Sequence, residues 1–304
     1  PSKLARLVPM GRPRGVVTAA AAEHLGVSAQ AVVADATIDS MTSAVGTGAI
    51  DQTRCGLVIG TTAVLATHLP DRRADVEHGL MAAPSPIPGH YVVVAENGIG
   101  GKALETFVHG VVYADDGLTG ASPSDAYERV LAAAAGVPAG ANGVVYLPWL
   151  VGSMAPSYHS RVRGGFLGLD LDTTRADMAR AVLEGVAANA AWLLPAVATL
   201  AGTSSPDIGF GGGVAVSPLW AQILADTMQL PIRRMANPRA TNAHGAALLA
   251  LVHAGELALT DLPTVIAGYT HEPDPALADW AVAQVARLAA AHTHLATLAT
   301  THPT

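Results

Sequence analysis

The sequence is poor in cysteine and in charge. Its single cysteine, Cys55, lies in the apolar run CGLVIG, so it cannot form an internal disulfide and is expected to be a buried packing residue. Nothing in the cysteine content requires an oxidising compartment. Only 13% of the residues are charged, half are hydrophobic, and Ala and Gly are abundant. We therefore expect a core of small side chains with closely packed helices and strands.

Neither a strongly basic block nor a membrane-length apolar run is present. The formal net charge is −7, which argues against nucleic acid or an anionic membrane as the main partner. No apolar run approaches the ~18 residues that span a bilayer. The N-terminal PSKLARLVPMGRPRG is basic but lacks the apolar centre of a signal peptide, so the cytoplasm is the expected location. Because the chain starts with Pro, we expect a fragment or a processed product.

Several motifs of known enzyme classes are also missing. The absence of GxxxxGK[ST] excludes a P-loop, and GFGGGVA lacks the GxGxxG spacing of dinucleotide-binding folds. No serine elbow of the α/β-hydrolase type is found. The 12 histidines are scattered, and neither HExxH nor CxxC is present. The sequence therefore predicts no metal site built from protein side chains.

What the sequence does contain is an alternation of strand and helix patterns, which predicts an α/β fold. Apolar runs predict strands at residues 31–35, 54–68 (two strands broken at Gly60-Thr61-Thr62), 90–98, 143–152, 207–210 and 231–235. Helical patterns cover residues 16–26, 100–113, 124–136, 173–200, 217–228, 242–255 and the tail from about 274. The length allows one large domain or two moderate ones.

Local signals set several expected boundaries. Gly26 is placed as a helix C-cap, and Ser124 as a helix N-cap. Thr174 and Asp177 have the spacing of a capping box. Four prolines between residues 70 and 90 predict a loop or lid there.

Three glycine-rich turns follow apolar runs, at residues 60–62, 98–101 and 211–213. Glycines let backbone N–H groups approach an anion, and a following helix N-terminus adds a favourable dipole. A Thr hydroxyl can donate a further hydrogen bond to a phosphate oxygen. The turns thus suggest phosphate binding, although each could instead only reverse the chain.

Asp39 lies where an apolar run gives way to small residues, in IDSMTSAVGTGAI. A carboxylate at such a junction is well placed to accept the proton of a hydroxyl that attacks a phosphate. It could instead be a helix N-cap. Asp35, four residues earlier, competes for the catalytic role.

Taken in order, these segments resemble the C-terminal portion of the FGGY carbohydrate kinases, most closely the xylulokinase-like branch. VVADATIDSMTSAVGTGAI is similar to the family segment that holds the catalytic aspartate, a match that assigns this role to Asp39. YLPWLVGSMAPSYHSRVRGGFLGLDLDTTRADMARAVLEGVA resembles the long signature of the family's second domain. IGFGGGVAVSPLWAQILAD is similar to the adenosine-binding turn, and NAHGAALLALVHAG to the closing GAA helix.

The resemblance implies the ribonuclease H-like fold of the actin and sugar-kinase superfamily, with a mixed sheet flanked by helices. It implies that ATP binds with Mg²⁺ bridging its β- and γ-phosphates, while Asp39 takes the proton of a sugar hydroxyl. Xylulose is the expected sugar. The implied nucleotide-binding residues come from the three turns and are Thr61, Thr62, Gly100, Gly101, Gly212, Gly213 and Ser217.

The resemblance also divides the chain. Residues 1–49 would be the remnant of an N-terminal sugar-binding domain, and residues 50–304 the ATP-binding domain. Without most of the first domain, the chain is expected to turn over little or nothing. The family's Gly-Glu-Arg-Ala-Pro is here Gly-Ser-Met-Ala-Pro, with Ser153 and Met154 at the altered positions, which removes any ion pair made there.

Two other functions stay open at this stage. The chain could be a non-catalytic nucleotide-binding or interaction module, or, less in keeping with the long signature, another actin-like ATPase. The Ala-rich C-terminal helix could pack on its own core or on a partner, as in a homodimer.

Overall fold

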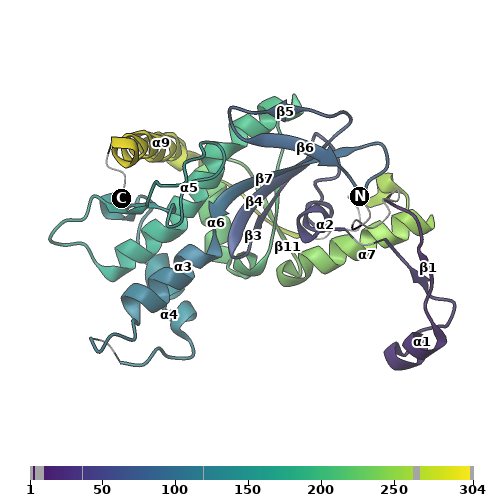
Figure 1. Ribbon diagram of the computed structural model, residues 1–304. Helices are drawn as coiled ribbons and strands as arrows, with labels where there is room; N and C mark the ends of the chain where they lie inside the picture. Colours follow the sequence, from purple (N-terminus) through teal and green to yellow (C-terminus); the bar gives the residue numbers. More distant parts are fainter. Residues whose placement is uncertain (1–2, 4–9, 36, 119, 263–267, 302–304) are drawn as a thin grey trace.

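The computed structural model describes residue 3 and residues 10–35, 37–118, 120–262 and 268–301. At its centre lies a mixed eight-stranded sheet (Figure 1). In spatial order its strands are β12 (Gly268–His271), β11 (Ile232–Met235), β10 (Ile208–Gly211), β3 (Cys55–Ile59), β4 (Thr62–Leu69), β7 (Tyr91–Ile99), β6 (Leu80–Pro84) and β5 (Ala74–Asp75).

Strand direction changes across the sheet. β10 pairs in parallel with both β3 and β11, whereas β3, β4, β7 and β6 pair antiparallel. The break predicted at residues 60–62 is confirmed, because β3 ends at Ile59 and β4 begins at Thr62. The sheet is therefore mixed, as expected for this α/β chain.

Helices cover both faces of the sheet. α5 and α6 pack on one face, whereas α2 and α7 pack together on the other (Figure 1). The longer helices are α1 (Ala19–Leu25), α2 (Asp39–Gly46), α3 (Gly101–Phe107), α4 (Ala126–Ala135), α5 (Arg175–Ala201), α6 (Pro218–Met228), α7 (Thr241–Ala254) and α9 (Ala278–Thr301). A π-helical turn, η1 (Val108–Val112), continues α3, and the short helical turns are η2 (Ala141–Gly143), η3 (Gly213–Val216), η4 (Pro238–Ala240), η5 (Leu259–Asp261) and η6 (Pro275–Leu277).

α5 is the central helix of the core. Its N-terminus carries the predicted capping box, in which Thr174 accepts from the Asp177 N–H and the Asp177 carboxylate accepts from the Thr174 N–H. It is the one helix in the described ranges that is long and apolar enough to cross a membrane, but 72% of that window is buried inside the protein. The core helix of a globular protein can have the same length and apolar composition. Because α5 is mostly buried, it is a core helix of this kind.

Cys55 is buried, as predicted. It is 5% exposed and packs in the main hydrophobic core. Burial raises the pKa of its thiol to about 12. A thiol that stays protonated at neutral pH is a poor nucleophile, so Cys55 acts as a packing residue.

Two expectations about local structure are wrong. The segment from residue 70 to 90 is not only a loop, because β5 and β6 lie within it and extend the sheet beyond β7. Pro84 is the last residue of β6, where a missing N–H is tolerated. Ser124 is not a helix N-cap either, because α4 begins at Ala126 and the flanking Asp125 accepts a hydrogen bond from Arg129 at 2.8 Å.

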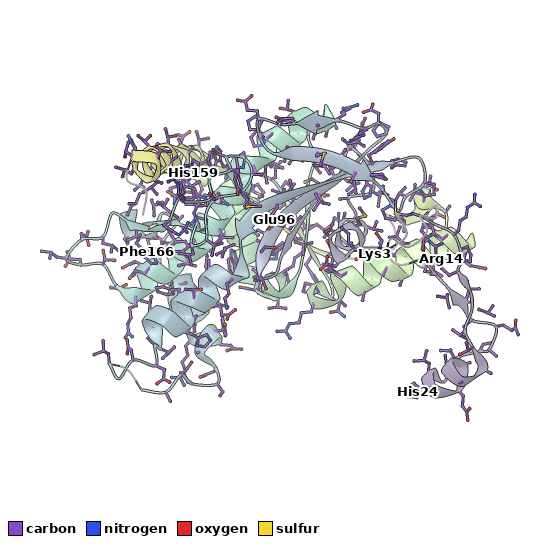
Figure 2. The ribbon with its side chains drawn as sticks, viewed as in Figure 1. Lys3, Arg14, His24, Glu96, His159 and Phe166 are labelled. Atoms are coloured by element: carbon purple, nitrogen blue, oxygen red, sulfur yellow. The ribbon has the colours of Figure 1, made fainter. Side chains whose placement is uncertain are left out.

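Residues 15–33 form an arm that projects from the body of the molecule (Figure 1). It consists of α1 and a two-stranded pair, β1 (Gly15–Val16) with β2 (Val32–Val33). Gly26 ends α1 in the left-handed conformation, as predicted from its position. His24 at the tip of the arm lies far from the sheet (Figure 2). Several apolar side chains of the arm are exposed: Val16, Leu25, Val27, Val32 and Val33.

At the other end of the chain, α9 packs on α5 and α6. Its inward face carries the buried residues Ala281, Gln284, Leu288 and His292. The sequence left open whether this helix packs on its own core or on a partner, and its buried face packs on its own core. A separate antiparallel pair, β8 (Val145–Leu147) with β9 (Gly165–Leu167), also packs against α5.

Candidate functional site

Two of the predicted turns are joined by backbone hydrogen bonds. The turn between β3 and β4 presents the carbonyl groups of Gly60 and Thr61 to the start of α3. The Gly101 N–H donates to the Gly60 carbonyl at 2.8 Å, and the Gly100 N–H donates to the Thr61 carbonyl at 3.0 Å. The first two turns therefore form one unit where β3 and β7 end and β4 begins.

Close packing explains why glycine occupies positions 100 and 101. A Cβ atom at Gly100 would lie 2.7 Å from Cγ2 of Ile59, and one at Gly101 would lie 2.5 Å from the Gly60 carbonyl oxygen. Either contact is too short for a real side chain. These two glycines are needed for the turns to meet, whether or not a ligand binds there.

The third turn contains glycines with different roles. Gly212 has a φ of +95°, and a Cβ there would lie 2.5 Å from the Ile59 carbonyl oxygen, so the backbone requires glycine. Gly213 is exposed, and a Cβ added to it would meet nothing within 4 Å. Packing therefore explains Gly212, whereas Gly213 faces open space.

That open space belongs to a cavity of about 670 Å³, here called the α4–α6 cavity. Its size is within the range of small-molecule sites. Three segments far apart in the sequence enclose it: the start of α3, one side of α4, and the chain from η3 into α6. The lining residues include Gly101, Leu104, Tyr127, Glu128, Leu131, Gly213, Ser217, Leu219 and Arg239.

Three of the predicted nucleotide-binding residues, Gly101, Gly213 and Ser217, line this cavity together. Gly100 and Gly212 are not among the lining residues but adjoin those that are. Thr61 and Thr62 also lie outside the lining and are exposed on the turn that holds Gly101. Ser217 is buried, and its hydroxyl caps α6 by accepting from the Trp220 N–H at 3.3 Å.

Sequence reasoning missed the α4 side of the cavity and Arg239. Tyr127, Glu128 and Leu131 belong to a helix whose pattern shows only that it is amphipathic. Arg239 lies in η4, between β11 and α7, and no hydrogen bond or ion pair to it is found among the described residues. Arg239 is the one lysine or arginine among the residues that line the cavity, so it could pair with an anionic group of a ligand bound there.

Glu96 was also missed. It lies in β7, in the middle of the sheet (Figure 2). Burial raises the pKa of its carboxyl group, and hydrogen bonds with the Thr62 side chain and the Gly98 backbone oppose this shift. The sequence signal that could have drawn attention to Glu96 is the presence of a carboxylate inside the apolar run YVVVAENG.

Asp39 is the first residue of α2 and is exposed, with Ile38 at the N-cap position. Among the described residues, its side chain has one hydrogen-bond partner, the neighbouring Ser40 N–H, which donates to Oδ1 at 2.8 Å. Asp35, by contrast, accepts from Arg14 and from the Gly11 N–H, and the bond from Arg14 lowers the pKa of its carboxyl group. The Asp39 carboxylate is therefore not paired with a cation among the described residues, whereas the Asp35 carboxylate is paired with Arg14. Asp39 does not line the α4–α6 cavity.

The comparisons with known proteins bear on this region. Residues 55–254 match the C-terminal domain of the FGGY family of carbohydrate kinases. The chain belongs to this family. A xylulose kinase of Staphylococcus epidermidis is 28% identical over 242 residues, which are 78% of this chain and 45% of that protein. A gluconokinase of Bacillus licheniformis is 25% identical over 275 residues, covering 90% of this chain and 53% of that protein.

Among solved structures, this FGGY chain is similar to xylulose kinase from Rhodospirillum rubrum. The TM-score is 0.79 at 26% identity, and the match covers 98% of this chain and 58% of the other. The match confirms the expected sugar-kinase fold. The chain spans about half the length of the relatives it matches.

The FGGY signature of this chain departs from the expected pattern at Ser153, and the structure shows what serine does there. It is 2% exposed, donates to the Ser157 carbonyl at 2.8 Å and lies 2.7 Å from Nε2 of His292 on α9. Since a hydroxyl has one proton, His292 Nε2 must carry the proton of their shared bond. His292 is thus a donor to Ser153, and the pair joins the signature loop to α9.

Proposed function

We propose that the protein catalyses ATP-dependent phosphorylation of a sugar hydroxyl. ATP would bind in the α4–α6 cavity, and Asp39 would act as the general base. One observation carries the proposal: a cavity of suitable size, within the segment that matches the family, brings together Gly101, Gly213 and Ser217. Gly213 and Ser217 are close in sequence, whereas Gly101 comes from a distant part of the chain.

The nucleotide-binding roles follow from the exposed groups. Gly213 has no side chain to fill the cavity, so its backbone can lie against the adenosine. Leu104, Leu131 and Leu219 supply apolar walls for a purine. Thr61 and Thr62 are exposed on the turn hydrogen-bonded to the start of α3, and their hydroxyl groups would contact the phosphates. Gly100 and Gly212 would act by holding these backbones in place.

Asp39 would perform the proton transfer. Its carboxylate is exposed and free of any cation among the described residues, so it can accept a proton from a sugar hydroxyl. Phosphoryl transfer depends mostly on positioning and charge stabilisation, so the base must be held in line with the phosphate. Its place in the first turn of α2, packed on α7 and the sheet, gives it a fixed position.

Mg²⁺ would be bound mainly by the nucleotide. The described residues contain no group of three or more His, Cys, Asp or Glu side chains that could hold a metal. This fits an ion that usually keeps several waters and binds through substrate phosphates with few protein ligands. Mg²⁺ would neutralise charge that develops on the phosphates during transfer.

We also propose that residues 1–49 belong with a first, sugar-binding domain, and residues 50–304 form the ATP-binding domain. The exposed apolar side chains of the arm support this division, since apolar surface of this kind usually marks a contact. The relatives are about twice as long as the part that this chain matches. The complete enzyme would be cytoplasmic and phosphorylate a pentulose, with xylulose first because of the similarity to xylulose kinases.

The test is a substrate panel with purified protein that includes the first domain. ADP formation would be measured with xylulose, gluconate and glycerol, and we expect xylulose to give the highest kcat/KM. Asp39→Asn should lower kcat by at least about a hundredfold, the usual contribution of a general base, and leave the Kd for ATP within about twofold. Asp35→Asn is the matched control and should cost less than about tenfold, because Asp35 is occupied by Arg14.

The same panel separates the alternatives. ATP binding without turnover of any sugar, by the complete protein, would favour a non-catalytic nucleotide-binding module. Equal losses for Asp39→Asn and Asp35→Asn would remove the assignment of the base. The 304-residue chain alone should bind ATP but form ADP at a rate far below that of the complete protein.

A further inference from the structure

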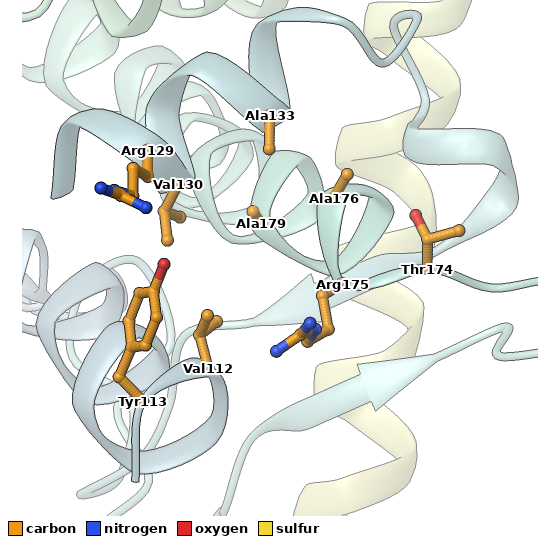
Figure 3. Close-up of a pocket in the computed structure, with 9 residues that line it drawn as sticks. All are labelled: Val112, Tyr113, Arg129, Val130, Ala133, Thr174, Arg175, Ala176 and Ala179. Carbon is orange, nitrogen blue, oxygen red and sulfur yellow. The ribbon is translucent and has the colours of Figure 1, made fainter. Parts of the chain in front are cut away.

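A second cavity, of about 390 Å³, lies on the other side of α4 (Figure 3). We call it the α4–α5 cavity. It is enclosed by α4, by the end of η1 and by the first turns of α5. Its walls are apolar, formed by Val112, Val130, Ala133, Ala176 and Ala179. None of the predicted nucleotide-binding residues lines it.

Two cations and the hydroxyl groups of Tyr113 and Thr174 stand around these apolar walls. The guanidinium groups of Arg129 and Arg175 and the hydroxyl of Tyr113 come from three different elements (Figure 3). Arg175 is exposed, and no ion pair or hydrogen bond of its side chain is found in the part of the chain that the structure describes. An unpaired arginine beside a cavity is available for a ligand.

Arg129 is only weakly engaged. It donates to Asp125 at 2.8 Å, one helical turn away, and both side chains are more than half exposed. An exposed pair of this kind adds little stability, so Arg129 can turn to a ligand at small cost. Within the described part of the chain, Asp125 is the one carboxylate that bonds to a cation lining this cavity, and its negative charge would oppose binding of an anion there.

We propose that the α4–α5 cavity binds a small organic anion and thereby controls the nucleotide cavity. The ligand class follows from the lining. Arginine guanidinium groups suit a phosphate or carboxylate head, and the valine and alanine walls suit a compact hydrocarbon part. Inorganic phosphate would leave the apolar walls uncovered, so it should bind more weakly than an organic phosphate.

The control follows from elements that the two cavities share. α4 presents Tyr127, Glu128 and Leu131 to the α4–α6 cavity, and Arg129 and Val130 to the α4–α5 cavity. The continuous segment of α3 and η1 lines the first cavity at its start and the second at its end. π-Helical turns such as η1 are often found at functional sites.

The position of α4 between the two cavities predicts whether the anion strengthens or weakens nucleotide binding. An anion between Arg129 and Arg175 would draw α4 toward α5. That movement takes α4 away from the chain that runs from η3 into α6, which closes the other side of the α4–α6 cavity. Nucleotide binding should weaken, and by linkage ATP should weaken binding of the anion by the same factor. This part rests on the proposed function, whereas binding of the anion does not.

Binding is tested by calorimetric titration of the 304-residue chain with phenyl phosphate, and with inorganic phosphate for comparison. We expect saturable binding of phenyl phosphate, at least tenfold tighter than that of inorganic phosphate. Arg175→Met and Arg129→Met should each weaken it at least tenfold. Asp125→Asn should tighten it about threefold, in the opposite direction. Arg72→Met, at an exposed arginine outside both cavities, should have no effect.

The outcomes separate the two parts of the proposal. No saturable binding, or equal affinity of Arg175→Met and the unaltered chain, would overturn the site. With phenyl phosphate bound, the Kd for ATP should rise about fivefold in the unaltered chain and stay constant in Arg175→Met. An unchanged Kd in both would overturn the control. If ATP failed to bind at all, the proposed kinase function would fall, while binding of phenyl phosphate that depends on Arg175 would still support the anion site.

Discussion

Gly212 and Gly213 are adjacent, yet the structure predicts opposite consequences for replacing them. A side chain at Gly213 enters the α4–α6 cavity without a clash at its Cβ atom, since no atom outside the adjoining residues lies within 4 Å of the place that this Cβ would take. A side chain at Gly212 meets the Ile59 carbonyl oxygen at 2.5 Å and would force a φ of +95° on an L-residue. Gly213→Val should therefore change binding, and Gly212→Ala should change stability.

The magnitudes follow from these contacts. For Gly212→Ala, backbone strain costs about 1–3 kcal/mol and the forced contact a further 1–3 kcal/mol, so the loss should be about 2–6 kcal/mol. In a chain of this size that lowers Tm by about 3–9 °C. Gly213→Val should alter unfolding by less than about 0.5 kcal/mol, as is usual for a surface site. Its isopropyl group would occupy space meant for adenosine and weaken ATP binding at least about tenfold, or 1.4 kcal/mol.

The assay pairs thermal unfolding with calorimetric titration of ATP on the same samples. Gly213→Ala serves as a graded control, with a smaller side chain and a smaller loss of affinity. If Gly213→Val unfolded like the unaltered chain and bound ATP with unchanged Kd, the nucleotide would not lie in the α4–α6 cavity, and the site assignment would be wrong.

Three further predictions concern other regions. His68 is buried, its Nδ1 donates to the Ala49 carbonyl at 2.5 Å, and burial lowers its pKa to about 4, below its usual 6.5. Because the unfolded chain takes up this proton first, stability should fall by about 3 kcal/mol as pH drops from 6.5 to 4, and His68→Asn should flatten that part of the urea-unfolding profile. Ser153→Glu, which restores the family residue, should destabilise the chain by about 3 kcal/mol or more in urea, because it puts a carboxylate in a buried site against His292; equal stability would contradict the role given to this pair. Arg239→Met should weaken ATP binding about tenfold in calorimetry and leave adenosine binding unchanged, as expected for a phosphate contact; equal losses for both ligands would place Arg239 elsewhere.

Features that depend on neighbouring residues could be predicted from the sequence. The break between β3 and β4, the capping box of α5 and the burial of Cys55 each follow from a few adjacent positions. The family could be recognised in the same way, since its motifs are continuous stretches. The match over residues 55–254 confirms that resemblance.

Features that arise from packing between distant segments could not be predicted. Tyr127 and Leu131 line the α4–α6 cavity because α4 lies beside α3 and α6, and nothing in the helix itself specifies those neighbours. β6 was missed because Pro84 and the prolines that flank the strand suggest a loop, while its pairing with β7 is set by the sheet. The glycines at 100 and 101 were assigned to a ligand, yet close contact between two turns already requires them.

The central claim is that ATP occupies the α4–α6 cavity, and photolabelling tests it most directly. The chain would be irradiated with 8-azido-ATP, digested, and the labelled peptides identified by mass spectrometry. The account predicts labels in residues 101–104, 127–135 and 213–220, all suppressed by excess ATP. Labels that ATP suppresses but that lie only outside these segments would contradict it.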